Sequence, residues 1–442
     1  MGTLKNIAYN RYSSYKDSGV GWLGEIPSSW SLTRLGTRFE ERKNKVSDKD
    51  FPPLSVTKNG TIPQLDSAAK SNDGDNRKLV KTGDFVINSR SDRKGSSGIA
   101  YQDGSVSLIY IVIEPKGINP IYCNYLLKSY NFIEEFYRMG HGIVADLWTT
   151  RYDEMKAIMI GIPTIEEQTA IAEFLDRKTA LIDQAIDIKQ KQIELLTERR
   201  QILIHKAVTR GLDPNVKMKD SGVEWIGEIP EHWELNRFRN IFNLSKGLTI
   251  TKENLTDSGV FCINYGEIHS KFGFEVNPEI NELKCVHEDY LKSDKNSLLK
   301  KGDFLFADTS EDISGSGNFT YLNSEIPTFA GYHTVIARPK FEINSRFFAY
   351  LFDSLCFRNQ IRIRVKGVKV FSITQSILKD PFIWLPSSDE QNNIVSFLDN
   401  QVKLISNAVE LKKREIEKLK EYKASLINSA VTGKIKVYND AE

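Results

Sequence analysis

The sequence predicts an α+β fold in which two globular α/β domains alternate with two long helices that pair as an antiparallel coiled coil, related by an internal pseudo-twofold repeat. Two observations predict this fold. The chain of 442 residues follows one plan twice, and each copy ends in a long stretch with helical spacing of its apolar residues. We expect a globular domain, a helical spacer, a second globular domain and a second spacer at residues 1–160, 161–212, 213–384 and 385–442.

The charge of the chain is nearly balanced, with 60 Lys and Arg against 58 Asp and Glu and a formal net charge of +2. This balance argues against a protein that binds nucleic acid by electrostatics alone. It is compatible with basic residues gathered on one face while acidic residues solvate the others. The four cysteines are too widely spaced for a zinc site or a disulfide framework, so we expect no metal; they are Cys123, Cys262, Cys285 and Cys356.

The first residues, MGTLKNIAYNRY, lack the apolar core of a signal peptide. No run in the chain approaches the roughly 18 apolar residues of a membrane span. We therefore expect a cytoplasmic protein that makes no use of a membrane.

Three segments occur in both halves of the chain. KDSGVGWLGEIPSSW at 16–30 matches KDSGVEWIGEIPEHW at 219–233. KTGDF and KKGDF form the second pair, and the third pair is IPTIEEQ and LPSSDEQ, each continuing into a helical stretch. The spacing between matching segments grows along the chain, which places the insertions in the interior of each half. The two copies are therefore expected to share a framework and to differ in their middles.

The stretch after each third segment is helical. Its apolar residues follow i, i+3, i+4, i+7 spacing with Lys, Arg, Glu and Gln between them. Each helix is expected to run roughly 40 residues, or about 60 Å. Pro163 and Pro386 precede the two helices, and Gly211 and Gly433 mark their ends. A helix this long and one-sided needs a partner along its length, and the other copy is the obvious one. The apolar positions are Ile171, Phe174, Leu175, Ile182, Ala185, Ile186, Ile193, Leu196, Leu203 and Ala207, matched by Ile394, Phe397, Leu398, Ile405, Ala408, Val409, Ile416, Leu419, Leu426 and Ala430.

The segments between are rich in β-forming residues and bounded by Gly, Asp and Ser. Strands are expected within residues 79–90, 106–115, 298–308 and 329–339. Shorter helical stretches are expected at 121–139 and 346–364. Each half is thus a mixed α+β globule followed by its long helix.

The motifs that would make this chain an enzyme are missing. It has no phosphate-binding loop, no dinucleotide-binding glycine motif after a strand, no zinc-protease helix and no nucleophile elbow. The six histidines do not cluster, and carboxylates such as Glu166 and Glu167 lie at a helix start. We therefore expect a binding protein with no catalytic residues, no cofactor and no metal.

Three polar stretches in each half have the composition of base-reading loops. Arg and Lys serve phosphates and guanine, Asn and Gln serve adenine, and Ser and Thr serve either. For any single basic residue, a solvated surface position is the equally weighted alternative. The Trp22/Trp30 and Trp225/Trp233 pairs are better explained by packing than by base stacking. The candidate DNA-binding residues are Lys58, Asn59, Ser89, Arg90, Arg93, Lys94 and Arg138 in the first half, and Asn264, Tyr265, Thr309, Ser310, Arg362, Arg364, Lys366 and Lys369 in the second.

The repeated segments resemble the specificity subunits of type I restriction-modification systems. The resemblance rests on KDSGV-x-W-x-GEIP-x-x-W, on K-x-GDF, and on P-x-x-x-EQ-x-x-I-x-x-FLD leading into a long helix that ends in AVTG or AVTRG. All three segments occur twice, and the resemblance covers nearly the whole chain.

The resemblance implies two target-recognition domains, each reading one half of a bipartite, asymmetric site in double-stranded DNA. It implies that the paired helices act as a ruler for the gap between the half-sites. It also implies two modification subunits, which methylate adenine, and restriction subunits with motor and nuclease activity as partners. Adenine methylation and ATP-dependent cleavage would then belong to the assembled complex and not to this chain.

Other functions stay open at this point. The chain could be an orphan specificity protein encoded at a shuffling locus. It could also be a coiled-coil adaptor that binds only protein, in which case no salt-dependent affinity for DNA is expected. A nuclease or methyltransferase with a cryptic site is disfavoured by the missing motifs.

Overall fold

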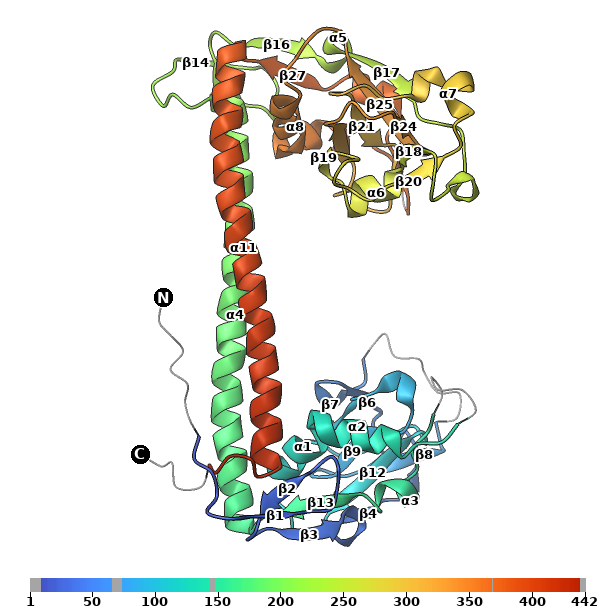
Figure 1. Cartoon of the computed structure of the whole chain (residues 1–442), viewed down its shortest axis with the longest axis vertical. Coiled ribbons are helices and arrows are strands. Elements are labelled where there is room, and N and C mark those ends of the chain that lie inside the picture. The colour runs from blue at the N-terminus through green and yellow to red at the C-terminus, as the bar shows by residue number, and fades with distance from the viewer. Residues whose placement is uncertain (1–8, 66–73, 143–147, 368, 438–442) are drawn as a thin grey trace. The chain divides into compact units, whose positions relative to one another are not determined.

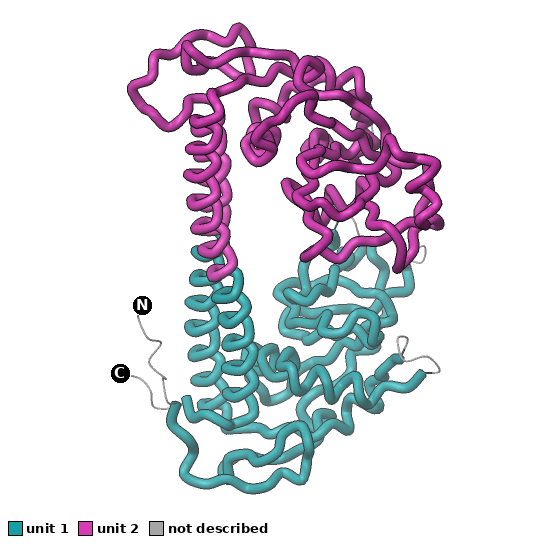
Figure 2. Tube along the Cα trace, turned by 45° about the horizontal axis from the view of Figure 1, so that its top comes forward, with its two compact units in different colours: residues 1–190, 413–442 teal, residues 191–412 magenta. Residues whose placement is uncertain are grey.

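The computed structural model describes residues 9–65, 74–142, 148–367 and 369–437. The chain divides into two compact units (Figure 2), one of residues 1–190 with 413–442 and one of residues 191–412. Each unit holds one globular part, the beginning of one long helix and the end of the other. The boundaries between the two units fall within the long helices α4 and α11.

The first unit builds its globular part from small antiparallel sheets and short helices (Figure 1). A four-stranded sheet has the order β10-β9-β12-β4, a three-stranded sheet has the order β11-β8-β5, and β1–β2, β6–β7 and β3–β13 form pairs. The bounds are β1 Tyr15–Asp17, β2 Glu25–Pro27, β3 Ser31–Arg34, β4 Phe39–Glu41, β5 Lys45–Val46, β6 Leu54–Thr57, β7 Gly60–Pro63, β8 Arg77–Val80, β9 Phe85–Asn88, β10 Ser97–Ile99, β11 Gly104–Val106, β12 Tyr110–Pro115, α1 Pro120–Lys128, α2 Tyr130–Arg138, α3 Tyr152–Met155 and β13 Met159–Ile162.

The second unit repeats this plan with a larger sheet. Five strands have the order β17-β25-β21-β23-β19, three have the order β20-β18-β24, and β14–β15, β16–β27 and β22–β26 form pairs. The bounds are β14 Met218–Asp220, β15 Glu228–Pro230, β16 Glu234–Arg237, α5 Phe238–Ile241, β17 Phe242–Lys246, β18 Val260–Ile263, α6 Tyr265–Ser270, β19 Phe274–Val276, β20 Lys284–Val286, α7 Tyr290–Ser293, β21 Phe304–Ala307, β22 Thr309–Ser310, β23 Phe319–Leu322, β24 Thr328–Ala330, β25 Thr334–Pro339, α8 Ser345–Asp353, α9 Leu355–Arg362, β26 Phe371–Ser372, α10 Gln375–Lys379 and β27 Phe382–Leu385.

The repeated K-x-GDF segment forms the turn into the central strand of each main sheet, β9 or β21. Gly83 and Gly302 have φ of 92° and 88°, a conformation that favours glycine over any residue with a Cβ. The following aspartate, Asp84 or Asp303, accepts a hydrogen bond from the backbone N–H at the start of the turn at 2.8 Å in both copies. Each of these buried carboxylates also pairs with an arginine at 2.6 Å. The repeated motif thus builds the same turn into a sheet strand in both halves.

The two shorter helical stretches expected from the sequence are each two helices and not one. Residues 121–139 divide into α1 and α2 at Ser129, and residues 346–364 divide into α8 and α9 at Ser354. Both serines have an extended backbone, with ψ of 146° and 145°. Each hydroxyl donates to the carbonyl three residues earlier, Leu126 or Leu351, which satisfies a group that the broken helix leaves open.

The predicted long helices are confirmed as α4 (Ile165–Arg210, 46 residues) and α11 (Ser388–Val431, 44 residues). They pack together in antiparallel fashion. In the first unit Asp183 pairs with Lys423 at 2.7 Å and Lys189 pairs with Glu415 at 2.6 Å, so the numbering runs in opposite directions along the two helices. In the second unit the end of α4 shares a hydrophobic core with the beginning of α11.

A tryptophan–glutamate contact fastens the start of each long helix to its globular part. Trp30 Nε1 donates to Glu167 Oε1 and Trp233 Nε1 donates to Glu390 Oε1, both at 3.1 Å. Both indoles are almost fully buried, as expected for packing residues, whereas the side chain of Trp225 is 38% exposed. The glutamate of the repeated EQ dipeptide thus fixes a helix to a domain in both copies.

The charge of Glu390 is strongly stabilised in the folded chain. Burial alone would raise its pKa, but hydrogen bonds from His232, Trp233 and Ser387 outweigh this effect and hold the pKa at about 2. The carboxylate lies 2.8 Å from His232 Nε2 and 2.8 Å from Ser387 Oγ. A lowered pKa means that the folded state gains stability wherever the group is ionised.

We predict that Glu390→Gln lowers the free energy of unfolding at pH 7 by about 1–2 kcal/mol, because charge-assisted hydrogen bonds are replaced by neutral ones. The difference from the wild type should shrink as pH falls below the usual value of 4.5 toward 2, since the wild-type carboxylate becomes protonated there. Chemical unfolding at several pH values measures this difference. Glu421→Gln, an exposed position on the same helix, is the control. A difference that stays constant with pH would contradict the prediction.

Candidate nucleic-acid interface

In the second unit, two of the three polar stretches expected to read DNA lie side by side. Strand β22 pairs with β26, so that Thr309 lies opposite Ser372 and Ser310 opposite Phe371. Lys366 also bridges to Ser372. Segments about sixty residues apart in the sequence are thereby joined into one surface.

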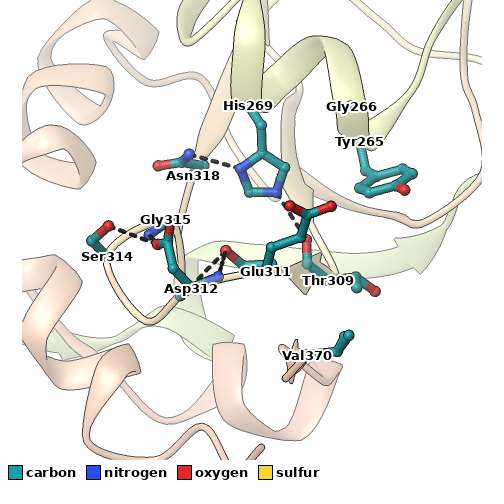
Figure 3. A pocket seen from close by; sticks show the side chains of 11 residues that line it. Tyr265, Gly266, His269, Thr309, Glu311, Asp312, Ser314, Gly315, Asn318 and Val370 are labelled. Atoms are coloured by element: carbon teal, nitrogen blue, oxygen red, sulfur yellow. Dashed lines mark hydrogen bonds between the residues drawn. The ribbon is translucent and has the colours of Figure 1, made fainter. Parts of the chain in front are cut away.

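This surface surrounds a cavity of about 600 Å³. The third predicted stretch reaches it through Tyr265, which begins α6. Figure 3 shows the side chains around the cavity, with Glu311 reaching toward His269. Three predicted residues, Tyr265, Thr309 and Ser310, thus share one site. The lining residues are Tyr265, Gly266, His269, Thr309, Ser310, Glu311, Asp312, Ser314, Gly315, Asn318 and Val370.

A chain of hydrogen bonds fixes one wall of this cavity. Arg358 can only donate, so its NH1 fixes the Asn318 Oδ1 atom as acceptor at 2.6 Å. The Asn318 Nδ2 group must then donate to His269 Nδ1 at 2.9 Å, which leaves the ring proton on Nε2. His269 Nε2 donates in turn to the Thr309 carbonyl at 2.8 Å. Each orientation follows from the previous one.

This series of hydrogen bonds continues from Arg358 to the long helix α4. The second guanidinium nitrogen of Arg358 donates to Asp353 Oδ1 at 3.0 Å, and Arg200 of α4 donates to Asp353 Oδ2 at 3.3 Å. Arg358 is also held over the ring of Phe319. The wall of the cavity is therefore tied through five side chains to the helix that the globular part packs against.

Basic residues follow the same segment. Lys366 and Lys369 are exposed, whereas Arg362 and Arg364 are half-buried. Arg362 donates to the Ser314 carbonyl, and both arginines keep one buried guanidinium nitrogen without a partner among the described residues. Burial and the nearby Arg358 charge lower the pKa of Arg362. An anion bound here would accept from the unpartnered guanidinium nitrogens and would offset the repulsion between Arg362 and Arg358.

Asn264 has a different position from the other predicted residues of this half. It is buried, with 3% exposed, and it caps α6. Its backbone N–H donates to Glu267 Oε2 at 3.0 Å. Asn264 is therefore a helix cap and is not among the residues that line the cavity.

In the first unit the corresponding segments also meet. Arg90 and His141 both bridge to Thr149, just as β22 and Lys366 meet β26 in the second unit. Ser89 and Arg90 line a cavity of about 360 Å³ together with Thr149, Arg151 and Tyr152 among others. Ser89 is buried, whereas Arg90 is exposed.

The other predicted residues of the first half lie on exposed turns and helix ends. Lys58 and Asn59 form the turn between β6 and β7. Arg93 and Lys94 lie in and after the short turn that follows Arg90, and Lys94 pairs with Glu134 at 2.7 Å. Arg138 ends α2 and is paired with Glu135 at 2.7 Å. The structure does not bring these residues into the cavity that Ser89 and Arg90 line.

The residues that sequence reasoning missed are mainly in the second cavity. They are His269, Glu311, Asp312 and Asn318. Glu311 and Asp312 directly follow the predicted Thr309-Ser310 pair, so extending that stretch would have included them. His269 and Asn318 carry no signal in the sequence, because only the fold brings them beside Thr309.

In the ranges that the structure describes, no three His, Cys, Asp or Glu side chains gather so that they could hold a metal ion. No helix among the described residues is both long and apolar enough to cross a membrane.

The chain is similar to named relatives over almost all of its length. The specificity subunit of the type I restriction enzyme MjaVIII from Methanocaldococcus jannaschii is 26% identical over 430 residues, covering 94% of this chain and 95% of that protein. The putative type I restriction enzyme MjaX specificity subunit from the same organism is 24% identical over 447 residues, covering 94% and 96%.

Solved structures share the fold. A chain from a study of complex assembly and conformational transition of the type I R-M system has a TM-score of 0.68 at 14% identity, covering 92% of this chain and 98% of that one. The HsdS subunit from Thermoanaerobacter tengcongensis has a TM-score of 0.51 at 15% identity, covering 93% and 98%.

The family model described as the type I restriction modification DNA specificity domain matches the chain twice, at residues 27–198 and 230–421. These two matches follow the two halves of the repeat and together cover most of the sequence. The chain therefore belongs to the type I restriction-modification DNA specificity family, with two copies of its domain.

Proposed function

We propose that each globular half reads one half of a bipartite, asymmetric site in double-stranded DNA, and that the paired helices set the gap between the half-sites. The chain performs no catalysis of its own. It docks two modification subunits, which methylate adenine, and restriction subunits that translocate and cut DNA. The four segments 1–160, 161–212, 213–384 and 385–442 are then first reader, first spacer, second reader and second spacer.

One contrast carries this proposal: the two halves keep the same framework contacts and differ in the cavities. The Trp30–Glu167 and Trp233–Glu390 hydrogen bonds have the same length, and the turns at Asp84 and Asp303 are built alike. The lining of the first cavity includes the basic residues Lys78, Arg90 and Arg151 beside its carboxylates. The lining of the second cavity, among the described residues, includes the carboxylates Glu311 and Asp312 but no Lys or Arg. Two readers of different half-sites need a common scaffold and different reading surfaces.

An exposed apolar stripe supports the docking of two like partners. Leu181 and Ile188 of α4 are spaced by seven residues, as are Leu404 and Leu411 of α11, and all four side chains are more than half exposed. The two pairs occupy equivalent places in the repeat. A chain with a pseudo-twofold repeat can offer the same surface twice, and an apolar stripe of this kind is typical of helix packing against a partner. A relative of the same fold comes from a study of complex assembly in a type I system.

A genome-wide map of methylated adenines in the native host tests the function. We expect a two-part asymmetric motif that is present with the gene intact and disappears on its deletion. An unchanged set of methylated motifs would contradict the proposal. Purified protein that shows no salt-dependent binding to DNA with its modification partner would favour a protein-binding adaptor instead.

Exchange of residues 36–160 for the matching segment of a relative with a different target should change one half-site and leave the other half-site and the gap intact. The reason is that this segment holds the first reading surface and none of the long helices. The methylation map of the exchanged strain measures both half-sites. A change in both would show that the two globular parts do not read independently.

The double substitution Lys366→Ala and Lys369→Ala should weaken binding to all DNA sequences alike, because phosphate contacts carry no sequence information. If both lysines contact phosphates, the slope of log K against log salt should become shallower by about 1.8, at about 0.9 for each contact. A salt titration of the assembled complex measures the slope. Lys292→Ala with Lys295→Ala, exposed in the same unit, is the matched control. An unaltered slope would remove these lysines from the interface.

A further inference from the structure

Most polar groups around the cavity of the second unit are already occupied. The hydrogen bonds that link His269, Asn318 and Arg358 use both ring nitrogens of the histidine and both the oxygen and the nitrogen of the asparagine amide. Asp312 Oδ1 accepts from Ser314 Oγ and from the Gly315 N–H, both at 2.6 Å.

The hydroxyl groups of the lining are committed as well. Thr309 Oγ1 donates to Asp308 Oδ1 and Ser310 Oγ donates to the Asp312 carbonyl, both at 2.7 Å. A ligand that enters this cavity therefore meets few free hydrogen-bonding groups.

Two polar groups of the lining have no hydrogen bond to a described residue, the hydroxyl of Tyr265 and the carboxylate of Glu311. Within the described residues, the Glu311 carboxylate has no hydrogen bond or ion pair, and Figure 3 shows it reaching into the cavity toward His269. Its side chain is exposed. The charged groups of the described lining are thus two carboxylates, which can only accept: Asp312 uses Oδ1 within its own loop, whereas Glu311 has both oxygens open to a ligand.

A free carboxylate is unfavourable beside DNA phosphates unless a donor on the DNA meets it, because like charges repel. The donors in the major groove are the amino groups of cytosine and adenine. Adenine presents its N6 amino group next to the N7 acceptor, so a carboxylate there would face a lone pair as well. Cytosine presents its N4 amino group without an acceptor on its own edge. The carboxylate thus fits cytosine best.

We propose that Glu311 specifies a cytosine in the half-site read by residues 213–384, by accepting a hydrogen bond from its N4 amino group in the major groove. His269, Asn318 and Arg358 act as positioning residues, because they pin the Thr309 carbonyl two residues before Glu311. Lys366 and Lys369 supply phosphate contacts beside the cavity. This inference rests on the proposed function and names one base pair of the target.

In the test, the gene in the host is replaced by one that encodes the Glu311→Gln variant, and methylated adenines are mapped across the genome. The exchange of residues 36–160 identifies which half-site belongs to the second domain. In that half-site, one position that is cytosine in the wild type should lose its preference by about 5- to 150-fold in relative methylation. The variant should also accept adenine at this position, because a glutamine amide can form hydrogen bonds with both N6 and N7 of adenine. The other half-site and the gap should be unchanged.

A second variant and a control complete the design. Glu311→Ala should relax the same position without the gain of adenine. Glu288→Gln, an exposed carboxylate of the same unit outside the cavity, should leave the motif as in the wild type. Unfolding midpoints of the variants exclude a folding defect.

The inference is overturned if the half-site of the second domain contains no C·G pair, or if Glu311→Gln leaves every position as selective as before. A uniform loss of methylation at all sites by stably folded variants would also overturn it, because loss of a base contact acts at one position. A wild-type map without any two-part motif would instead refute the proposed function, so the two failures can be told apart.

Discussion

Each globular core of this chain is completed by the end of the long helix that belongs to the other half. Ile204, Ala207 and Val208 near the end of α4 are buried in the core of the second unit. Leu426, Ala430 and Val431 near the end of α11 are buried in the core of the first. Burial of side chains the size of Ile, Leu or Val contributes about 1.5–3 kcal/mol each, so these helix ends are a substantial part of both cores. The antiparallel pairing of the helices follows from this exchange.

The buried tryptophan–glutamate contacts act at the opposite end of each helix. Glu167 and Glu390 each accept from the indole of their own half, which fixes the start of the helix on the domain that precedes it. Each domain is therefore attached to the start of its own helix and to the end of the other. In the second unit the position of the cavity wall at Thr309 depends on such an attachment, since this wall is connected through Asp353 and Arg200 to α4.

Much of this architecture could be predicted from the sequence, because it depends on short-range patterns. The spacing of apolar residues predicted both long helices, and Pro163, Pro386 and the following glycines marked their limits. The breaks at Ser129 and Ser354 were missed because serine is tolerated within a helix and its hydroxyl bond to the preceding turn is visible only in the structure. The repeated motifs were correctly assigned to the framework, and the structure supplies the hydrogen bonds that explain them.

The linings of the two cavities could be predicted only in part. Residue type and loop position led to Tyr265, Thr309, Ser310 and Arg90, which line the cavities. Asn264 has the same residue type but is used as a helix cap, a role that depends on where α6 begins. Asn318 enters the site because its carbonyl accepts from the Ala307 N–H at the end of β21, and His269 enters through its hydrogen bonds to the Thr309 carbonyl and to Asn318. No local sequence pattern predicts these contacts. Long-range contacts of this kind decide which polar residues face a ligand.

The role of the helix pair as a ruler is the central claim, and lengthening both helices tests it most directly. Seven residues inserted beside Lys189 in α4 and beside Glu415 in α11, which face each other, would preserve the heptad seam. The helices would grow by about 10.5 Å, or about three base pairs of B-form DNA at 3.4 Å each. A methylation map of this variant should show both half-sites unchanged and a gap longer by about three base pairs. An unchanged gap, or altered half-sites, would contradict the account.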